Sequence, residues 1–217
     1  MPENKIYNSN HRTIRNGYKK IAKALGSKYG VYRPVSNDVP VTDVRNWQFD
    51  IYFSNTLNVG YQTPKEFGLP VYKGYFDNTD VITGDFLYDE NRTFYVADIP
   101  VFEPAVTIEC FDTCTISSRK WDSATRSFIQ EVIVNGAPCN VQPNGTQTLN
   151  RDPESHSEPD HLHKWRIHTY LHDQSAVSLN DLLVDSKGNK SYITQIVRTQ
   201  HGHEIECVEI KNDPAPL

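Results

Sequence analysis

Long apolar runs are missing from this sequence, and charged residues occupy the N-terminus where a signal peptide would need an apolar stretch. No segment approaches the roughly 20 apolar residues that a membrane-spanning helix requires. We therefore expect a protein that is made in a cytosol and has no membrane partner. Cysteines are few, and in that setting we expect them to be reduced, buried thiols. They are Cys110, Cys114, Cys139 and Cys207.

An excess of positive charge is also missing, because 22 Lys and Arg stand against 27 Asp and Glu, which gives a net charge of −5. A nucleic-acid-binding surface gains affinity by displacing counterions with Lys and Arg. We therefore expect no specific nucleic-acid partner.

Motifs of familiar enzymes are lacking as well. The sequence has no Gly-rich phosphate loop, no GxSxG turn around a nucleophilic serine and no HExxH helix. Cys139 lies in GAPCNV, where nothing marks an oxyanion turn or a group that would orient a Cys–His pair. We predict that the chain is not an enzyme and has no catalytic residue and no cofactor.

Two His-x-His pairs, His161/His163 and His201/His203, raise the alternative of a metal site. Residues two apart on a strand project from the same face, so each pair could present two imidazoles to one ion. This spacing is generic, and the pairs lie in a polar part of the chain. We expect no metal site, and a metal-dependent hydrolase built on these histidines is the third of three functional hypotheses.

One helix is expected over residues 12–25, where apolar residues recur at helical spacing and Gly26 can end the helix. Its other face is basic; it is either a solvated face or an arm that docks on an acidic partner. Residues 26–43 are rich in Gly, Pro, Ser and Asp and are predicted to be an extended linker. We therefore expect residues 1–43 to be a helix and arm outside the core, so that a chain beginning near Val41 would still fold.

Short alternating segments separated by turn residues fill the chain from Val44 onward, and the high Tyr, Thr, Val and Ile content favours strands. Strands are expected at 46–54, 70–77, 92–99, 105–117, 127–136, 164–173, 190–197 and 203–211, and a long polar loop at 138–159. The predicted fold class is mainly β, with two similar small β-barrel or sandwich modules, 44–118 and 119–217, preceded by a short N-terminal α-helix and an extended arm.

An internal repeat supports the two modules, because residues 81–99 are similar to residues 177–197. The aligned pairs are Asp85/Asp181, Leu87/Leu183, Asp89/Asp185 and, after a one-residue gap, Tyr95/Tyr192 and Cys110/Cys207. We predict that each copy is a strand, a polar hairpin turn and a returning aromatic strand, because Asp side chains favour such turns. The repeated aspartates are then turn formers on separate modules and not a catalytic pair.

Tyrosine and arginine are favoured at protein interfaces because they offer a large contact area with a polar tip. They are concentrated in the expected arm and in residues 61–75, and basic residues line the expected helix. The interface candidates are Arg15, Lys19, Tyr29, Tyr32, Arg33, Tyr61, Tyr72 and Tyr75.

Two segments carry a resemblance to known proteins. GYKKIAKALGSKYGVYRP (residues 17–34) resembles the opening of a family of tailed-phage virion proteins, in which a short helix leads into a Tyr-Arg-Pro motif. TGDFLYDENRTFYVADIPVFEPAVTIEC (residues 83–110) is similar to the hairpin of such proteins and of head-completion (stopper) β-barrels. The resemblance covers about a third of the chain.

The resemblance implies a neck, collar or head–tail connector subunit with no catalytic residues to carry over. Its expected partners are other copies of itself in a ring and other phage neck, portal or tail proteins. Its expected location is the virion, after synthesis in the bacterial host cytoplasm. The alternative is a tail-fibre or baseplate receptor module, whose glycan site would use the aromatic residues between Tyr61 and Tyr75 as a platform.

Overall fold

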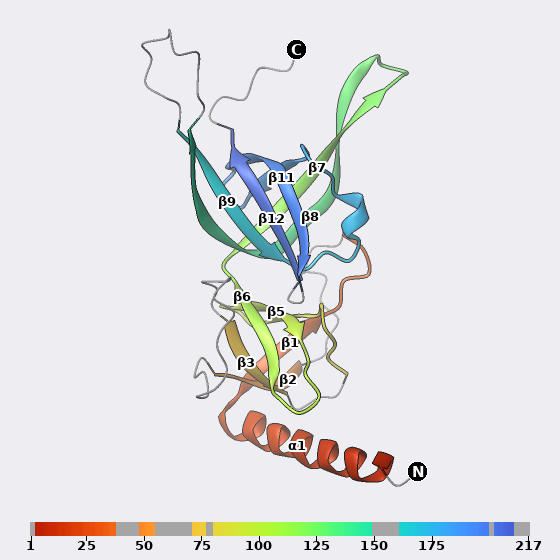
Figure 1. Cartoon of the computed structure of the whole chain (residues 1–217), viewed down its shortest axis with the longest axis vertical. Helices are drawn as coiled ribbons and strands as arrows, with labels where there is room; N and C mark the ends of the chain where they lie inside the picture. The colour runs from red at the N-terminus through yellow and green to blue at the C-terminus, as the bar shows by residue number, and fades with distance from the viewer. Residues whose placement is uncertain are drawn as a thin grey trace. The chain divides into compact units, whose positions relative to one another are not determined.

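The computed structural model describes residues 3–37, 48–54, 71–76, 80–148, 161–199 and 202–210. Within these residues, one α-helix, α1 (Glu3–Leu25), is followed by twelve β-strands (Figure 1). The chain divides into two compact units, Met1–Pro34 with Val41–Cys110, and Val35–Pro40 with Phe111–Leu217. Each unit contains a closed six-stranded β-barrel, which confirms the predicted fold class.

The first barrel is formed by strands in the order β1-β2-β3-β6-β5-β4, and all its neighbouring strands are antiparallel. These strands are β1 (Ser27–Tyr32), β2 (Gln48–Ser54), β3 (Val71–Phe76), β4 (Phe86–Tyr88), β5 (Thr93–Asp98) and β6 (Ala105–Cys110). Pairing of β1 with β4 closes the barrel and places Val31 opposite Leu87. Closure satisfies the backbone edges that an open sheet would leave exposed.

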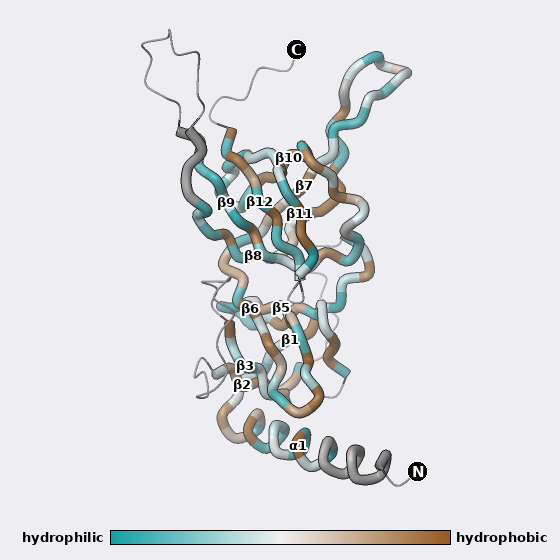
Figure 2. Tube along the Cα trace, viewed as in Figure 1, coloured by the Kyte–Doolittle hydropathy of each residue, from teal (hydrophilic) through white to brown (hydrophobic). Residues whose placement is uncertain are grey.

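An aromatic cluster fills the first barrel. Phe94 is fully buried, and its ring stacks on that of Phe53 with 3.9 Å between centroids. Tyr29 and Tyr72 meet the Phe94 ring edge-on at 6.1 and 5.4 Å. Alternate strand residues point to the same side, and Figure 2 shows the resulting alternation of hydrophilic and hydrophobic residues along the strands.

Helix α1 belongs to the first unit and packs across β2 and β3. Its C-terminal part buries Ala22 and partly buries Tyr18. Gly26 ends the helix, where a Cβ atom would overlap the carbonyl oxygens of Ala22 and Ile51. The close approach of helix and barrel at this position therefore requires glycine.

The second barrel has the strand order β7-β8-β9-β12-β11-β10, which repeats the order of the first when the strands of each barrel are numbered along the chain. These strands are β7 (Asp112–Asp122), β8 (Ser127–Thr148), β9 (His161–Thr169), β10 (Leu182–Asp185), β11 (Lys190–Thr199) and β12 (Gly202–Glu209). A short 3₁₀ helix, Gln174–Ala176, precedes β10. On β12, Ile205 and Cys207 lie in the core, whereas Glu204 and Glu206 are only partly buried.

The first repeated hairpin is fixed at its entry by a set of local hydrogen bonds. The Gly84 N–H donates to the carbonyl oxygen of Val96 (2.8 Å), and the Val96 N–H donates to that of Asp85 (2.9 Å). The buried Asp85 carboxylate accepts the Ile82 N–H at 2.9 Å. Asp85 is therefore a turn-forming residue, as the sequence predicts.

The second hairpin repeats this set bond for bond. Asn180 donates to Ile193 (2.8 Å) and Ile193 to Asp181 (3.0 Å) through backbone groups, and the Asp181 carboxylate accepts the Ser178 N–H at 2.7 Å. Asn180 has a φ of 68°, and the equivalent Gly84 has a φ of 93°. Gly and Asn are the residues that tolerate this left-handed conformation best. The predicted similarity of the two hairpins is confirmed.

The strand registers correct one aligned pair of the repeat. Val96 lies opposite Thr107 across β5–β6, and the equivalent Ile193 lies opposite Cys207 across β11–β12. Cys207 therefore corresponds to Thr107 and not to Cys110. All four cysteines are buried free thiols, as expected.

The boundaries of the modules also differ from those expected. Residues 27–32 form β1 within the barrel and not an extended arm, because their inward side chains complete the aromatic core. The expected strand 105–117 is two strands, β6 and β7, so the units divide at Cys110/Phe111 and not at 118/119. Residues 138–148 belong to β8 and not to a loop, because they pair with β7 or β9. The rest of the expected loop lies outside the described residues.

Among the described residues, no helix has the length and apolar character that crossing a membrane requires.

Two truncations test whether β1 belongs to the first barrel. A chain that begins at Gly26 loses α1 but keeps β1, and we expect it to retain the near-ultraviolet circular dichroism of the packed Tyr and Phe side chains. A chain that begins at Arg33 loses β1, so the first barrel cannot close and that signal should largely disappear. Equal retention of the signal in both chains would contradict the role assigned to β1.

Candidate interaction surface on the first barrel

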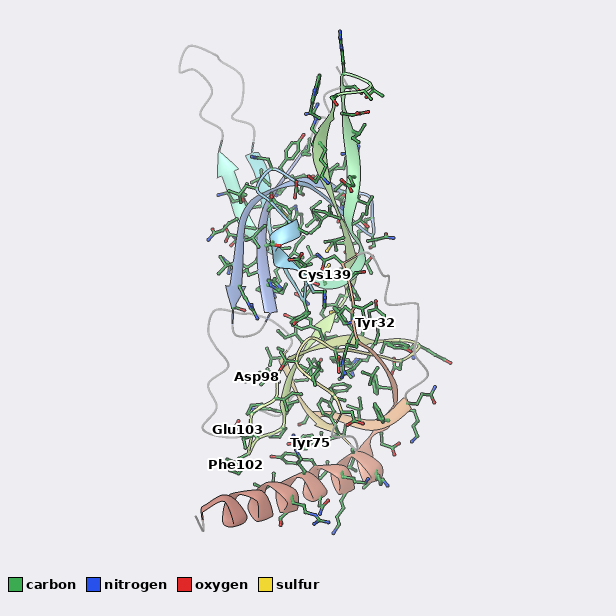
Figure 3. All side chains as sticks on the ribbon, turned by 90° about the vertical axis from the view of Figure 1, so that its right-hand side faces the viewer. Tyr32, Tyr75, Asp98, Phe102, Glu103 and Cys139 are labelled. Atoms are coloured by element: carbon green, nitrogen blue, oxygen red, sulfur yellow. The ribbon has the colours of Figure 1, made fainter. Side chains whose placement is uncertain are left out.

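Tyr18 anchors α1 to the first barrel. Its hydroxyl donates to the Phe102 carbonyl oxygen at 3.0 Å, and its ring meets that of Tyr75 edge-on at 5.3 Å. Burial, with smaller contributions from Tyr75 and the Glu103 carboxylate, raises the pKa of Tyr18. Figure 3 shows Tyr75, Phe102 and Glu103 on the side of the barrel that faces α1. The helix and the loop before β6 are thereby held together.

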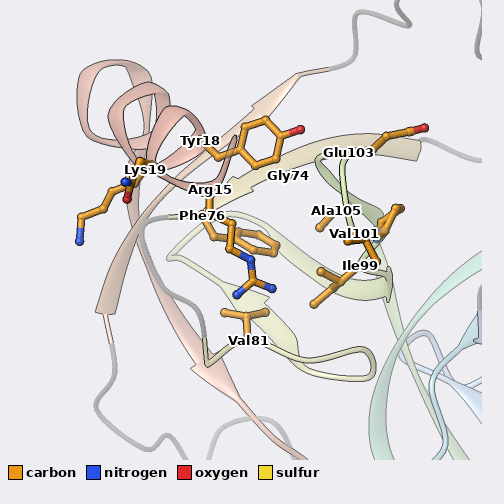
Figure 4. A pocket seen from close by; sticks show the side chains of 12 residues that line it. Arg15, Tyr18, Lys19, Gly74, Phe76, Val81, Ile99, Val101, Glu103 and Ala105 are labelled. Atoms are coloured by element: carbon orange, nitrogen blue, oxygen red, sulfur yellow. The ribbon is translucent and has the colours of Figure 1, made fainter. Parts of the chain in front are cut away.

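A pocket of about 310 Å³ lies between α1 and the barrel. Its apolar wall includes Phe76, Val81 and Ile99. Arg15 and Lys19 contribute positive charge from α1, and Figure 4 shows Arg15 reaching toward Val81. We name this feature the basic pocket.

An acidic side chain, Glu103, also lines the basic pocket. Its carboxylate forms an ion pair with Lys73 at 3.3 Å. The exposed side chains of Val101 and Phe102 stand beside it in the same loop. The pocket therefore combines an apolar wall, an exposed apolar rim and helix-borne positive charge.

Three of the interface candidates gather at this surface. Arg15 and Lys19 line the pocket, and Tyr75 packs on Tyr18 beside them. Tyr72 instead lies in the aromatic cluster, with the Arg92 guanidinium 5.1 Å above its ring. Tyr61 lies outside the described residues.

Tyr29 and Tyr32 correct the expectation of an exposed anchoring motif. Their exposed fractions are 5% and 4%, because both belong to the barrel-closing strand β1. They pack inside the first unit: Tyr29 against Phe53 at 5.0 Å, and Tyr32 against Phe86 at 6.5 Å. Tyr29 lies in the aromatic cluster inside the barrel, so a partner cannot reach it without opening the barrel, and Tyr32 is covered within its own unit.

Arg33 is bound within its own unit and is not an open contact residue. Its Nε and Nη2 atoms donate to the two carboxylate oxygens of Asp85 at 2.7 and 2.8 Å, and Nη2 also donates to the Asp80 carbonyl oxygen at 2.6 Å. The hydrogen bond to Asp85 is the main cause that raises the pKa of Arg33. A bidentate pair of this kind compensates the burial of the Asp85 carboxylate, so Arg33 stabilises the repeated turn.

A second exposed surface, the β7–β8 ribbon (residues 118–131), was not expected from the sequence. Part of β7 pairs with β10, and part of β8 pairs with β9. Beyond these parts, β7 and β8 pair with each other and with no other described strand. Figure 1 shows the ribbon extending away from the second barrel. Trp121 and Ile129 on it are 58% and 45% exposed. The alternation of apolar and polar residues predicts these strands, but it does not indicate which strands extend past the barrel.

No group of three or more His, Cys, Asp or Glu that could hold a metal ion is present among the described residues. The His203 Nδ1 atom accepts the Leu171 N–H at 3.0 Å, which gives this buried imidazole a structural role. His163 is exposed, whereas His201 and the side chain of His161 lie outside the described part of the structure.

The geometry defines the class of the protein as a tandem of two closed six-stranded barrels with an N-terminal helix. No family model, curated protein or solved structure matches the chain.

The buried imidazoles predict how stability depends on pH. Burial, assisted by a nearby arginine, lowers the pKa of both His168 and His203 from 6.5 to about 4. The unfolded chain therefore binds more protons between these values, and the free energy of unfolding should decrease as pH falls from 6.5 toward 4. In urea unfolding measured across this pH range, the free energy of unfolding of His203→Asn should decrease less steeply than that of the original chain.

His163→Asn makes the same substitution at an exposed position and serves as the control for this measurement. An equal slope in the original chain and in His203→Asn would contradict the assignment of His203 as a buried neutral imidazole.

Proposed function

We propose that the chain is a structural virion protein of a tailed bacteriophage, a neck, collar or head–tail connector subunit that assembles into a ring. The resemblance of residues 17–34 and 83–110 to such proteins motivates the proposal. Two closed barrels provide rigid bodies whose strand edges are largely satisfied, so association must use side-chain surfaces and projecting elements.

The observation that carries the proposal is the separation of charge between α1 and the rest of the chain. The helix contains six Lys or Arg and one Glu, which gives it +5, so the rest of this −5 chain carries −10. The described basic side chains of α1 are exposed. Complementary charges on one chain favour association and fix its orientation. Such a chain is suited to head-to-tail assembly with copies of itself.

Exposed apolar side chains add to this argument. Val101 and Phe102 flank the basic pocket, and Trp121 and Ile129 lie on the β7–β8 ribbon. Aromatic and aliphatic side chains of this kind supply the cores of protein interfaces. A connector subunit must contact neighbours in its ring and in adjacent rings, and these surfaces offer contacts for both.

The glycan-binding alternative receives less support from the described part of its platform. Tyr72 lies beneath Arg92 in the aromatic cluster, and Tyr75 packs against Tyr18 and Tyr52. These rings stabilise the first unit and do not form an open aromatic face.

Removal of the gene from the phage that encodes it tests the proposal. Electron microscopy of the lysate should show filled or partly filled heads separated from tails, and a plasmid copy of the gene should restore joined particles. Intact, infectious particles assembled without the protein would contradict the proposed function.

A further inference from the structure

Two hollows of different charge lie on opposite sides of the first barrel. The basic pocket is bordered by Phe76 of β3 and Ala105 of β6. A second hollow, of about 490 Å³, is bordered by Lys28 of β1, Tyr88 of β4 and the turn that follows β4. In the ring order β1-β2-β3-β6-β5-β4, the β3/β6 pair stands directly across from the β4/β1 pair. The two hollows therefore face in opposite directions.

The second hollow is acidic because of the β4–β5 turn. Asp89 fixes this turn, since its Oδ1 atom accepts the N–H groups of Asn91 and Arg92 at 2.8 and 2.7 Å. Glu90 stands exposed at the tip. The basic residue of this hollow, Lys28, is paired with Asp50 at 2.8 Å. We name this turn, formed by Asp89, Glu90 and Asn91, the acidic turn.

We propose that the acidic turn of one copy docks at the basic pocket of the next copy, with Glu90 facing Arg15. This inference rests on the proposed function and names the contact by which copies associate. The partner is a second copy of this chain because both complementary surfaces are present on the same barrel. Surfaces on opposite sides give a head-to-tail contact, which propagates from copy to copy and closes into a ring if the rotation permits.

The second barrel shows why the contact is specific to the first. Its matching turn, which is one residue longer, is also held by an aspartate: the Oδ1 atom of Asp185 accepts the N–H groups of Lys187 and Asn189 at 2.9 and 2.8 Å. The tip of this turn carries the exposed Lys187. A lysine presented to Arg15 would be repelled, so the basic pocket discriminates between the two turns by charge.

A charge-reversal experiment on the full chain tests the contact. Sedimentation velocity at low and high ionic strength should show that the original chain associates, more strongly at low ionic strength. Arg15→Glu and Glu90→Lys should each weaken association about tenfold, because each places like charges together. The double variant should recover most of the association, since the pair is restored with its signs exchanged. Circular dichroism melting should confirm that each variant is folded.

A matched control separates the local contact from overall charge. Lys20→Glu makes the same charge change as Arg15→Glu on α1 but outside the basic pocket, and it should associate like the original chain. Weakening by Lys20→Glu equal to that of Arg15→Glu would overturn the inference, as would failure of the double variant to recover.

Other outcomes distinguish the inference from the proposed function. Association that is unaffected by Arg15→Glu and Glu90→Lys overturns the contact but leaves ring assembly standing. An original chain that stays monomeric at every concentration also overturns the contact. Head–tail joining by phage that carry Glu90→Lys, compared with the gene deletion, then decides the function separately.

Discussion

Each barrel depends on the pairing of its first strand with its fourth. In the first barrel β1 pairs with β4 and sets Val31 against Leu87, and in the second β7 pairs with β10 and sets Ile116 against Leu183. All of these side chains are buried in the two cores. Without this pairing both barrels would be open sheets with exposed edges and an unfilled interior.

The repeated aspartate turns prepare this closure. Asp85 and Asp181 fix the entry to the fourth strand through the same backbone and carboxylate hydrogen bonds. Arg33, which follows β1 directly, binds Asp85 and so ties the end of the first strand to the start of the fourth. The barrels then differ where contacts with partners are expected: the first bears α1 and the acidic turn, and the second extends β7 and β8 into a ribbon.

Much of the fold follows from local patterns in the sequence. The hairpins around Asp85 and Asp181 were predictable because alternation and Asp turn chemistry act over a few residues. Strand β1 was missed because SKYGVYRP places Gly and Pro around a short alternating run, and its burial depends on pairing with distant strands. The boundary at Phe111 was missed because β6 and β7 are nearly continuous in sequence. For the interface, the helix charges were visible, but the burial of Tyr29 and Tyr32 depends on barrel closure.

Hydrogen exchange measured by nuclear magnetic resonance tests the closure of the first barrel most directly. The hydrogen-bonded amides of β1 should exchange as slowly as those of β5, since both strands can open only when the barrel unfolds. The amides of β7 in the segment that pairs with β10 should behave like those of β1. Rapid exchange throughout β1 beside slow exchange in β5 would show that residues 27–32 are an arm and would contradict the closure of the first barrel through β1.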